Sequence, residues 1–202
     1  MMKRMLSLVL ALMMLILPCA SMAEQNYKVY SDPAGRFSFC YPFDWTLLSK
    51  DTIDELFEIA KTQGDEEYQA VIEQAYPQIE ATGMIMLMSE DMTSNINVVL
   101  QPVGMEGSPE LLMAISDMLC SQLQQSAAGE LEFLNEPYLL DITEDRKVMA
   151  IEYVNRVIGM EMYGMQIYET VGTDMMVYTL TTADSSFDAA ETLGYVVGST
   201  SY

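Results

Sequence analysis

The sequence contains no histidine, a single tryptophan, and only 9 basic residues against 30 acidic ones. Without histidine, the chain alone cannot build a Ser-His-Asp or Cys-His catalytic centre, or a metal site with imidazole ligands. Its formal net charge of −21 repels nucleic acid and anionic lipid surfaces, so neither is expected as a partner. The 202 residues suffice for one domain with a sizeable core, and a hydrophobic content of 50% argues against intrinsic disorder.

The first 23 residues have the pattern of a secretory signal peptide. Lys3 and Arg4 precede an apolar run over residues 5–17, and the segment ends in Ser21-Met22-Ala23. The apolar run is shorter than the roughly 20 residues that a membrane-spanning helix needs, although an uncleaved anchor remains an alternative. We expect cleavage after Ala23, which leaves a secreted mature chain of residues 24–202 with no membrane span. That chain keeps 30 acidic and 7 basic residues, a formal net charge of −23.

Three cysteines leave two questions open. Cys19 could be lipidated. In the lipoprotein signals that this segment would then resemble, a small residue precedes the cysteine, but here that position is occupied by Pro18. In the mature chain, Cys40 and Cys120 could form a disulfide, which export permits. They could equally be two separate buried thiols, because free cysteine packs like a small hydrophobic residue. Neither has a neighbouring histidine or lysine that would make the thiol reactive.

The mature chain alternates between two periodicities. Period-two runs predict strands at residues 27–30, 36–41, 84–89, 95–103, 131–140, 147–155, 162–171 and 175–182. Helical spacing predicts helices near residues 51–60, 68–75, 108–129 and 186–197. The last four strands are joined by such short turns that they must be antiparallel. The sequence therefore predicts one α+β domain, an antiparallel sheet with helices packed against it.

Local signals give this outline further detail. Phe37, Phe39 and Tyr41 share one face of their predicted strand, which should be the core face. The only tryptophan, Trp45, follows that strand after Pro42 and is expected to pack as a lid on the core.

The helix starts are predicted from capping residues. Asp51 is expected to cap the first helix. Ser108, followed by proline and glutamate, is a strong start for the helix that Gly129 ends. The last helix is predicted to begin at Ser185 or Ser186.

Several of these segments resemble PsbP/Mog1-like domains. The resemblance is carried by Tyr30-Ser31-Asp32, Gly35-Arg36-Phe37-Ser38-Phe39, Tyr41-Pro42-x-x-Trp45, Asn95-Ile96-Asn97-Val98-Val99, Tyr178-Thr179-Leu180-Thr181, Phe187 and Val197-Gly198-Ser199. It spans residues 27–202 and implies an α/β/α sandwich around an antiparallel sheet. Members of this superfamily serve as photosystem accessory subunits or bind a small GTPase, and many bacterial members are exported. The histidine metal ligands of the photosynthetic branch have no counterpart here, and a nuclear GTPase partner is incompatible with an export signal.

Methionine is unusually frequent. Six of the 19 methionines lie in the leader, which leaves 13 in the mature chain. Met84, Met86 and Met88 would share one side of a strand, and a second cluster comprises Met160, Met162 and Met165. Thioethers select Cu(I), so a methionine-based copper site is one interpretation. Packing in the core is the favoured one, because methionine fills irregular gaps and spacing alone does not show that ligands converge.

The acidic residues carry no clear chemical motif. Asp141-Ile142-Thr143-Glu144-Asp145 places oxygen ligands at alternate positions but lacks the glycine and closing glutamate of a calcium loop, so a solvated hairpin turn is favoured. Asp65-Glu66-Glu67 is typical of the first turn of a helix. A carboxylate-dependent hydrolase remains open, but with 30 acids some pair falls at any chosen separation. The sequence shows no glycine-rich phosphate loop, Gly-x-Ser-x-Gly elbow or Ser-x-x-Lys motif.

Together, these observations favour a secreted, non-catalytic binding or accessory module. Its partner is an unidentified protein or envelope component, and we assign it no catalytic, cofactor-binding or metal-binding residues. The two alternatives are a methionine-based copper-binding protein and a carboxylate-dependent hydrolase.

Overall fold

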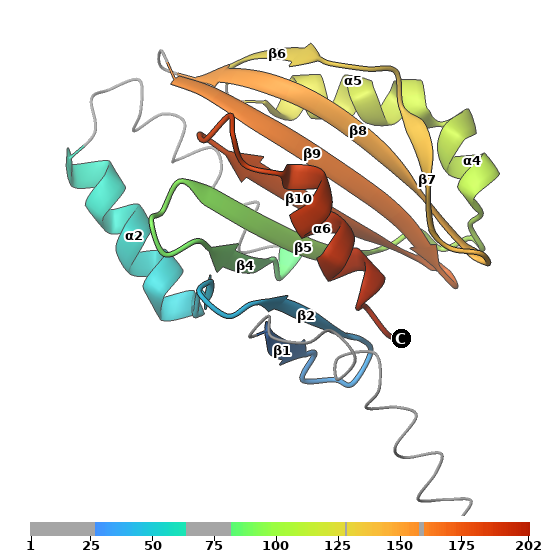
Figure 1. Cartoon of the computed structure of the whole chain (residues 1–202), viewed down its shortest axis with the longest axis horizontal. Coiled ribbons are helices and arrows are strands. Elements are labelled where there is room, and N and C mark those ends of the chain that lie inside the picture. The colour runs from blue at the N-terminus through green and yellow to red at the C-terminus, as the bar shows by residue number, and fades with distance from the viewer. Residues whose placement is uncertain (1–26, 64–81, 128, 158–159) are drawn as a thin grey trace, which may run out of the picture. The chain divides into compact units, whose positions relative to one another are not determined.

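The computed structural model describes residues 27–63, 82–127, 129–157 and 160–202 (Figure 1). Contacts divide the chain into two units, residues 1–44 with 195–202 and residues 45–194. Outside the described residues lie the leader, the predicted helix at 68–75 and the acidic run that begins at Asp65.

The unit of residues 45–194 is built on an eight-stranded sheet. Its strands are β3 (Thr46–Leu47), β4 (Ile85–Met88), β5 (Ser94–Pro102), β6 (Glu130–Phe133), β7 (Tyr138–Thr143), β8 (Arg146–Val157), β9 (Met160–Val171) and β10 (Asp174–Thr182). They follow the order β3-β4-β5-β10-β9-β8, and both β6 and β7 pair with β8. Every pairing is antiparallel, as the short turns predict.

Helices lie on both faces of this sheet. They are α2 (Lys50–Gln63), α4 (Pro109–Ala114), α5 (Ser116–Ser126) and α6 (Ala189–Gly198). The helices α4 and α5 pack on one face, and the first turns of α6, up to residue 194, lie on the other (Figure 1). The predicted α+β class is confirmed: the sheet is antiparallel and has a helical layer on each side.

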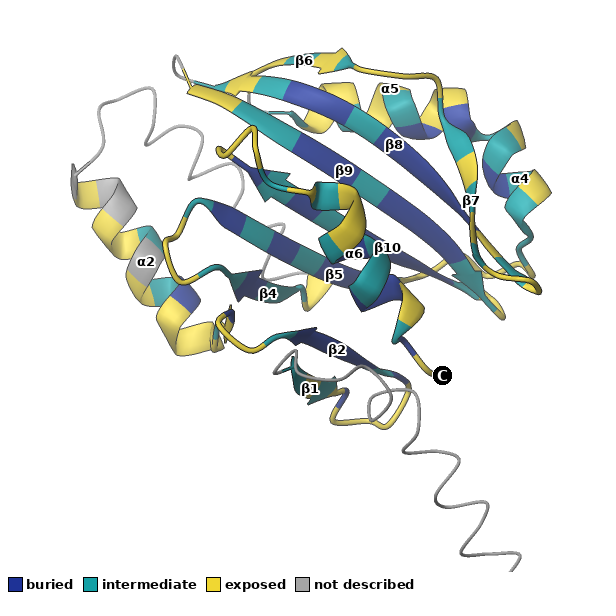
Figure 2. Ribbon diagram, in the orientation of Figure 1, coloured by how far each residue is buried: buried dark blue, intermediate teal, exposed yellow. Residues whose placement is uncertain are grey.

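The core under α4 and α5 follows from the two-residue period of the strands. Side chains from β8, β9 and β10 form it with two helical leucines: Met149, Ile151, Tyr153, Tyr168, Met175, Val177, Leu112 and Leu119. On the opposite sheet face, Ile96, Val98 and Leu180 are fully buried. Buried residues run along the central strands, and β6 at the edge is largely exposed (Figure 2). The long central strands are thus buried on both faces.

Two predicted elements are divided in the structure. The single strand predicted at 131–140 is β6 and β7, separated by residues 134–137, because Pro137 has no N–H to continue the ladder. The helix predicted at 108–129 is α4 and α5, since the backbone leaves helical geometry at Ile115 (φ −104°, ψ 8°). Its start is confirmed: the Leu111 N–H donates to Ser108 Oγ at 3.2 Å.

Two other helix starts were predicted at the wrong residue. The cap of α2 is Ser49, whose Oγ accepts from the Thr52 N–H at 3.1 Å, and Asp51 lies inside the first turn. The helix α6 begins at Ala189, later than Ser185 or Ser186. Asp188 is its cap, because its Oδ1 accepts from the Glu191 N–H at 2.8 Å.

In the other unit, β1 (Tyr27–Ser31) and β2 (Ser38–Pro42) form an antiparallel hairpin. The predicted core face of the second strand is confirmed, since Phe37, Phe39 and Tyr41 are at most 6% exposed. Ser38 also pairs with Ser201 near the chain end. The hairpin and the C-terminal residues therefore share one short ladder.

Candidate functional site

A pocket of about 390 Å³ lies on the α6 side of the eight-stranded sheet, within residues 45–194. Four parts of the chain line it: Leu134 after β6, Glu152 of β8, Tyr163, Gly164 and Met165 of β9, and the segment 184–190 that leads from β10 into α6. These four parts are far apart in the sequence, and the pairing of the strands in the sheet brings them together.

The register of β8 against β9 builds the floor of the pocket. Glu152 is paired with Met165, so their side chains lie beside each other on the same sheet face. The next pair, Tyr153 with Gly164, directs the tyrosine ring to the opposite face, under α5. The Leu134 N–H donates to the Glu152 carbonyl at 2.9 Å, which holds Leu134 at the rim.

The segment between β10 and α6 forms a wall and is fixed by local hydrogen bonds. The Ala183 N–H donates to the Thr93 carbonyl at 2.9 Å. Asp184 Oδ1 accepts from the N–H and the Oγ of Ser186, at 2.9 and 2.7 Å. Asp188 Oδ1 accepts the hydrogen bond from the Glu191 N–H that caps α6. The Oδ2 atoms of both aspartates accept no hydrogen bond from the part of the chain that the structure describes.

Glu152 is held in place by two donors. The Tyr138 hydroxyl donates a short hydrogen bond to Oε1, and the Asn135 side-chain amide donates to Oε2 at 3.1 Å. Burial, reinforced by the bond to Glu152, raises the pKa of Tyr138 above its ordinary value. The tyrosine therefore remains a protonated donor at neutral pH.

The pocket combines negative charge with apolar walls. Glu152, Asp184 and Asp188 line it, and none of the described lining residues is basic. Hydrogen bonds from Ser186 lower the pKa of Asp184, so this carboxylate is charged at neutral pH.

The apolar walls of the pocket are held by packing. Leu134 and Met165 contribute aliphatic surface, and Phe187 contributes an aromatic ring. The Phe187 ring lies 6.2 Å from the ring of Trp45, which is 3% exposed. Burial of the only tryptophan agrees with its predicted role as a lid.

The strands bring together only part of each predicted methionine cluster. Met86 and Met88 are half-buried on β4, but Met84 lies before that strand begins. In the second cluster, Met160 and Met162 share one face of β9 while Met165 lies on the other. Among the described residues, no group of three or more histidine, cysteine, aspartate or glutamate side chains could hold a metal ion.

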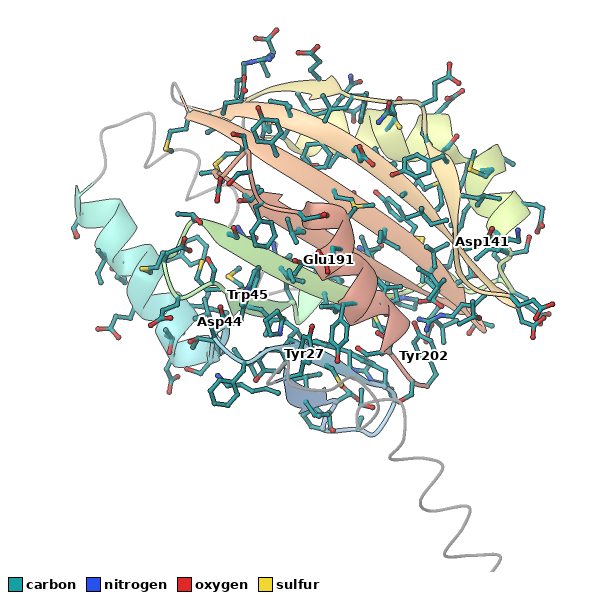
Figure 3. The ribbon with its side chains drawn as sticks, in the orientation of Figure 1. Tyr27, Asp44, Trp45, Asp141, Glu191 and Tyr202 are labelled. Carbon is teal, nitrogen blue, oxygen red and sulfur yellow. The ribbon has the colours of Figure 1, made fainter. Side chains whose placement is uncertain are left out.

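The remaining predicted features are structural. The loop after Asp141 is the exposed turn of the β7–β8 hairpin, and Asp141 forms an ion pair with Lys147 at 2.7 Å (Figure 3). Cys40 is buried in β2 and Cys120 is half-buried in α5, and the two form no disulfide with each other. Burial raises the pKa of Cys120, which makes its reactive thiolate less available.

The sequence patterns did not predict this pocket. The polar run Asp184-Ser185-Ser186-Phe187-Asp188 between a strand and a helix was the available signal, but it was interpreted as a helix start. Predicting the pocket also requires the register of β8 against β9, because this pairing decides which sheet face Glu152 shares with the segment 184–188.

No known protein family and no curated protein matches the sequence. Solved structures do match. Cyanobacterial PsbP (CyanoP) from Synechocystis sp. PCC 6803 has a TM-score of 0.54 and 14% identity, over 90% of this chain and 95% of that one. The Ran-binding protein Mog1p of Saccharomyces cerevisiae has a TM-score of 0.52 and 9% identity, over 88% of this chain and 96% of that one.

The chain has a PsbP/Mog1-like fold. This likeness confirms the resemblance that the sequence motifs carry, and at such low identity it establishes the fold alone. The structure of a protein from Bacteroides thetaiotaomicron is also similar to this chain, with a TM-score of 0.52 and 14% identity over 86% of it. The chain spans about half the length of that protein, 47%. Within the described residues, every helix is too short or too polar to cross a membrane.

Proposed function

We propose that this protein is a secreted, non-catalytic binding module that recognises a partner outside the cell or in the envelope through the pocket beside α6. The observation that carries the proposal is the pocket itself, an open concavity of about 390 Å³ on a PsbP/Mog1-like fold. Mog1p, which shares this fold, is a Ran-binding protein, so the fold serves binding in at least one relative. The signal-like leader supports a partner outside the cytoplasm.

The chemistry of the pocket favours binding over catalysis. The chain has no histidine to act as a general base. Both oxygens of Glu152 accept hydrogen bonds, and Asp184 and Asp188 each use one oxygen to fix the backbone. These carboxylates hold the pocket in shape. Turnover of any substrate that Glu152→Gln abolishes would contradict a non-catalytic role.

Blocking the pocket tests the proposal directly. Ala190 is exposed in the first turn of α6 and lines the pocket, so Ala190→Trp should fill part of it without changing the charge. Ala114, exposed at the end of α4 and outside the pocket lining, provides the matched control Ala114→Trp.

The purified exported protein and both variants are immobilised and exposed to envelope and culture-medium fractions of the producing cell. We expect a partner that the wild type and Ala114→Trp retain and that Ala190→Trp retains at least about tenfold less. Equal retention by all three proteins would show that the pocket is not the contact site, and retention of nothing would contradict a binding function.

Export is tested with the native leader. When the whole chain is expressed in a bacterial host, we expect the product in the medium or periplasm to begin at Glu24. Membrane-bound product that keeps Met1 would instead support an uncleaved anchor. Product with a lipid on Cys19 would support a lipoprotein, and either result contradicts free secretion.

A further inference from the structure

We propose that the pocket beside α6 binds a lysine or arginine side chain of a partner protein, with its cation at Asp184 and Asp188 and its stem along the apolar wall. This inference rests on the proposed binding function and names the chemical group that is recognised.

The first argument is charge complementarity. Glu152, Asp184 and Asp188 line the pocket, and among the described lining residues there is no lysine or arginine to neutralise them. The guanidinium of Arg156, on the same strand as Glu152, forms ion pairs with Glu132 at 2.9 Å and with Glu161 at 3.0 Å. Asp184 and Asp188 are exposed, but three carboxylates that line one concavity attract a cation more strongly than a single carboxylate would.

The second argument concerns hydrogen-bond acceptors. The Oδ1 atoms of Asp184 and Asp188 are occupied by the local backbone, which fixes the direction of each carboxylate. Each Oδ2 is left without a described donor. A carboxylate oxygen held in this way is a preorganised acceptor, and bonds from ammonium or guanidinium groups to carboxylates are among the stronger ones in proteins.

The third argument is the wall of the pocket. Leu134, which is 48% exposed, presents aliphatic surface, whereas Met165 lines the pocket but is only 3% exposed. Phe187 and Tyr163 add aromatic residues to the lining. Long basic side chains bury an aliphatic stem while their charged end stays polar, and their cations are attracted to aromatic faces. The volume of about 390 Å³ is near the lower limit for ligand pockets, which suits one side chain.

An anion fits this site less well, although the N-terminus of α6 borders it. Helix N-termini attract anions through their free N–H groups. Here the Glu191 N–H already donates to Asp188 and the Ser186 N–H donates to Asp184. An anion would therefore meet two charged carboxylates and lose two of the donors it needs.

The test uses small probes with matched neutral analogues. N-acetyl-lysine methylamide and N-acetyl-arginine methylamide are titrated into the purified exported protein while amide NMR shifts are followed. The neutral analogues carry Nε-acetyl-lysine and citrulline in place of lysine and arginine. We expect saturable, millimolar binding of one or both cations with shifts at residues 184–190, weakened by added salt. The neutral analogues should show no saturation.

The charge dependence is tested with the double variant Asp184→Asn and Asp188→Asn. Asparagine keeps the Oδ1 acceptor and caps helices as well as aspartate does, so the wall should keep its shape. The control is Glu144→Gln with Asp145→Asn in the exposed β7–β8 turn, which removes the same net charge. The first variant should bind the cationic probes about tenfold more weakly, and the control should bind as the wild type does.

Three results would overturn the inference: equal binding of cationic and neutral probes, equal binding by the two double variants, or saturation by inorganic phosphate in place of the cations. These failures differ from failure of the proposed function. If Ala190→Trp no longer binds the partner but the Asp184/Asp188 variant still does, the pocket binds a partner without recognising a cationic side chain. If the cationic probes bind but Ala190→Trp still retains the partner, the cation site stands and the partner binds elsewhere.

Discussion

At the scale of single residues, the turn between β1 and β2 depends on one carboxylate. Asp32 Oδ2 accepts from the Ala34 N–H and the Arg36 N–H, both at 3.1 Å, and from Arg36 Nε at 2.9 Å. Its Oδ1 accepts from Arg36 Nη2 at 2.8 Å. The side-chain bonds from Arg36 lower the pKa of Asp32 to about 2, against the opposing effect of burial.

The first prediction concerns Asp32→Asn, which keeps an acceptor but removes the charge. Because the pKa is lower in the folded state than the ordinary 3.8, the charged form stabilises the fold above pH 4, and this stabilisation is lost as the pH falls toward 2. The wild type should exceed Asp32→Asn by roughly 1 to 2 kcal/mol at pH 7. Urea unfolding at pH 7, 5, 3 and 2 should show the difference closing.

The control is Asp44→Asn, at an exposed aspartate of the same unit. It should change the free energy of unfolding by less than about 0.5 kcal/mol. A difference between wild type and Asp32→Asn that stays constant from pH 7 to pH 2 would contradict a stabilising charge.

Gly164 is the second residue whose identity has a clear physical cause. A Cβ placed there would lie 2.3 Å from two ring carbons of Tyr153, closer than any real contact. That ring is 5% exposed and packs in the core under α5, so it cannot move aside at low cost. Glycine is thus required here by the close approach of an aromatic ring from the neighbouring strand.

We therefore predict that Gly164→Ala lowers the free energy of unfolding by about 1 to 3 kcal/mol through overpacking. Gly194 in α6 offers the matched control, because a Cβ there would meet no atom within 4 Å. Gly194→Ala should raise stability by up to about 1 kcal/mol, since alanine favours helix. Thermal unfolding of both variants gives the sign of each change in stability. A change of the same sign in both would show that the Tyr153 ring does not decide the effect at Gly164.

At the scale of elements, a bidentate ion pair joins β8 to β9. Arg146 Nε and Nη2 donate to the two oxygens of Glu169 at 2.5 and 2.7 Å. The side chains are 21% and 7% exposed, so the ion pair satisfies both oxygens of a largely buried carboxylate. A pair of this kind contributes little net stability, but breaking it is costly because a buried charge is left uncompensated.

The corresponding prediction is a double-mutant cycle. Glu169→Leu alone should cost about 3 kcal/mol, because Arg146 is left partly buried without its carboxylate. Arg146→Met with Glu169→Leu should return to within about 1 kcal/mol of the wild type, since an apolar pair fills the same space. Urea unfolding of the single and double variants measures both. Additive losses in the double variant would show that the pair is not coupled.

Elements were predictable where one local pattern decides them. Ile96 and Val98 alternate with asparagines, and this period of two correctly predicted the strand at residues 95–103, which is β5. The split between β6 and β7 was missed because Leu131, Phe133 and Leu139 stay in the same two-residue phase on both sides of the break. The effect of the missing N–H of Pro137 becomes decisive only beside β8. The start of α6 was misplaced because four neighbouring side chains, from Asp184 to Asp188, can all cap a helix.

The candidate site was less predictable than the elements that form it. Its lining residues come from β8, β9, residue 134 and the segment before α6, and no sequence spacing relates them. The chemistry of the lining could be anticipated from the excess of acids, but which carboxylates face one another depends on strand register. Long-range pairing thus determines the site, whereas short-range pattern determines most elements.

At the scale of the whole molecule, we propose that residues 24–202 fold as one domain. The PsbP/Mog1-like fold extends over 90% of the chain in the match to PsbP, which includes residues of both units. The helix α6 is continuous across the point where the units divide, between residues 194 and 195. A break in one unit should therefore propagate along the helix, because helix formation is cooperative.

This proposal predicts one unfolding transition, and the chain provides a probe in each unit. Trp45, the only tryptophan, is buried in the unit of residues 45–194, and the backbone amides of β2 belong to the other. The native NMR signals of the β2 amides should disappear at the same urea concentration at which Trp45 fluorescence changes. Midpoints that differ beyond error, with loss of the β2 signals preceding the fluorescence change, would mean that the hairpin unit unfolds on its own and that the chain contains two folding domains.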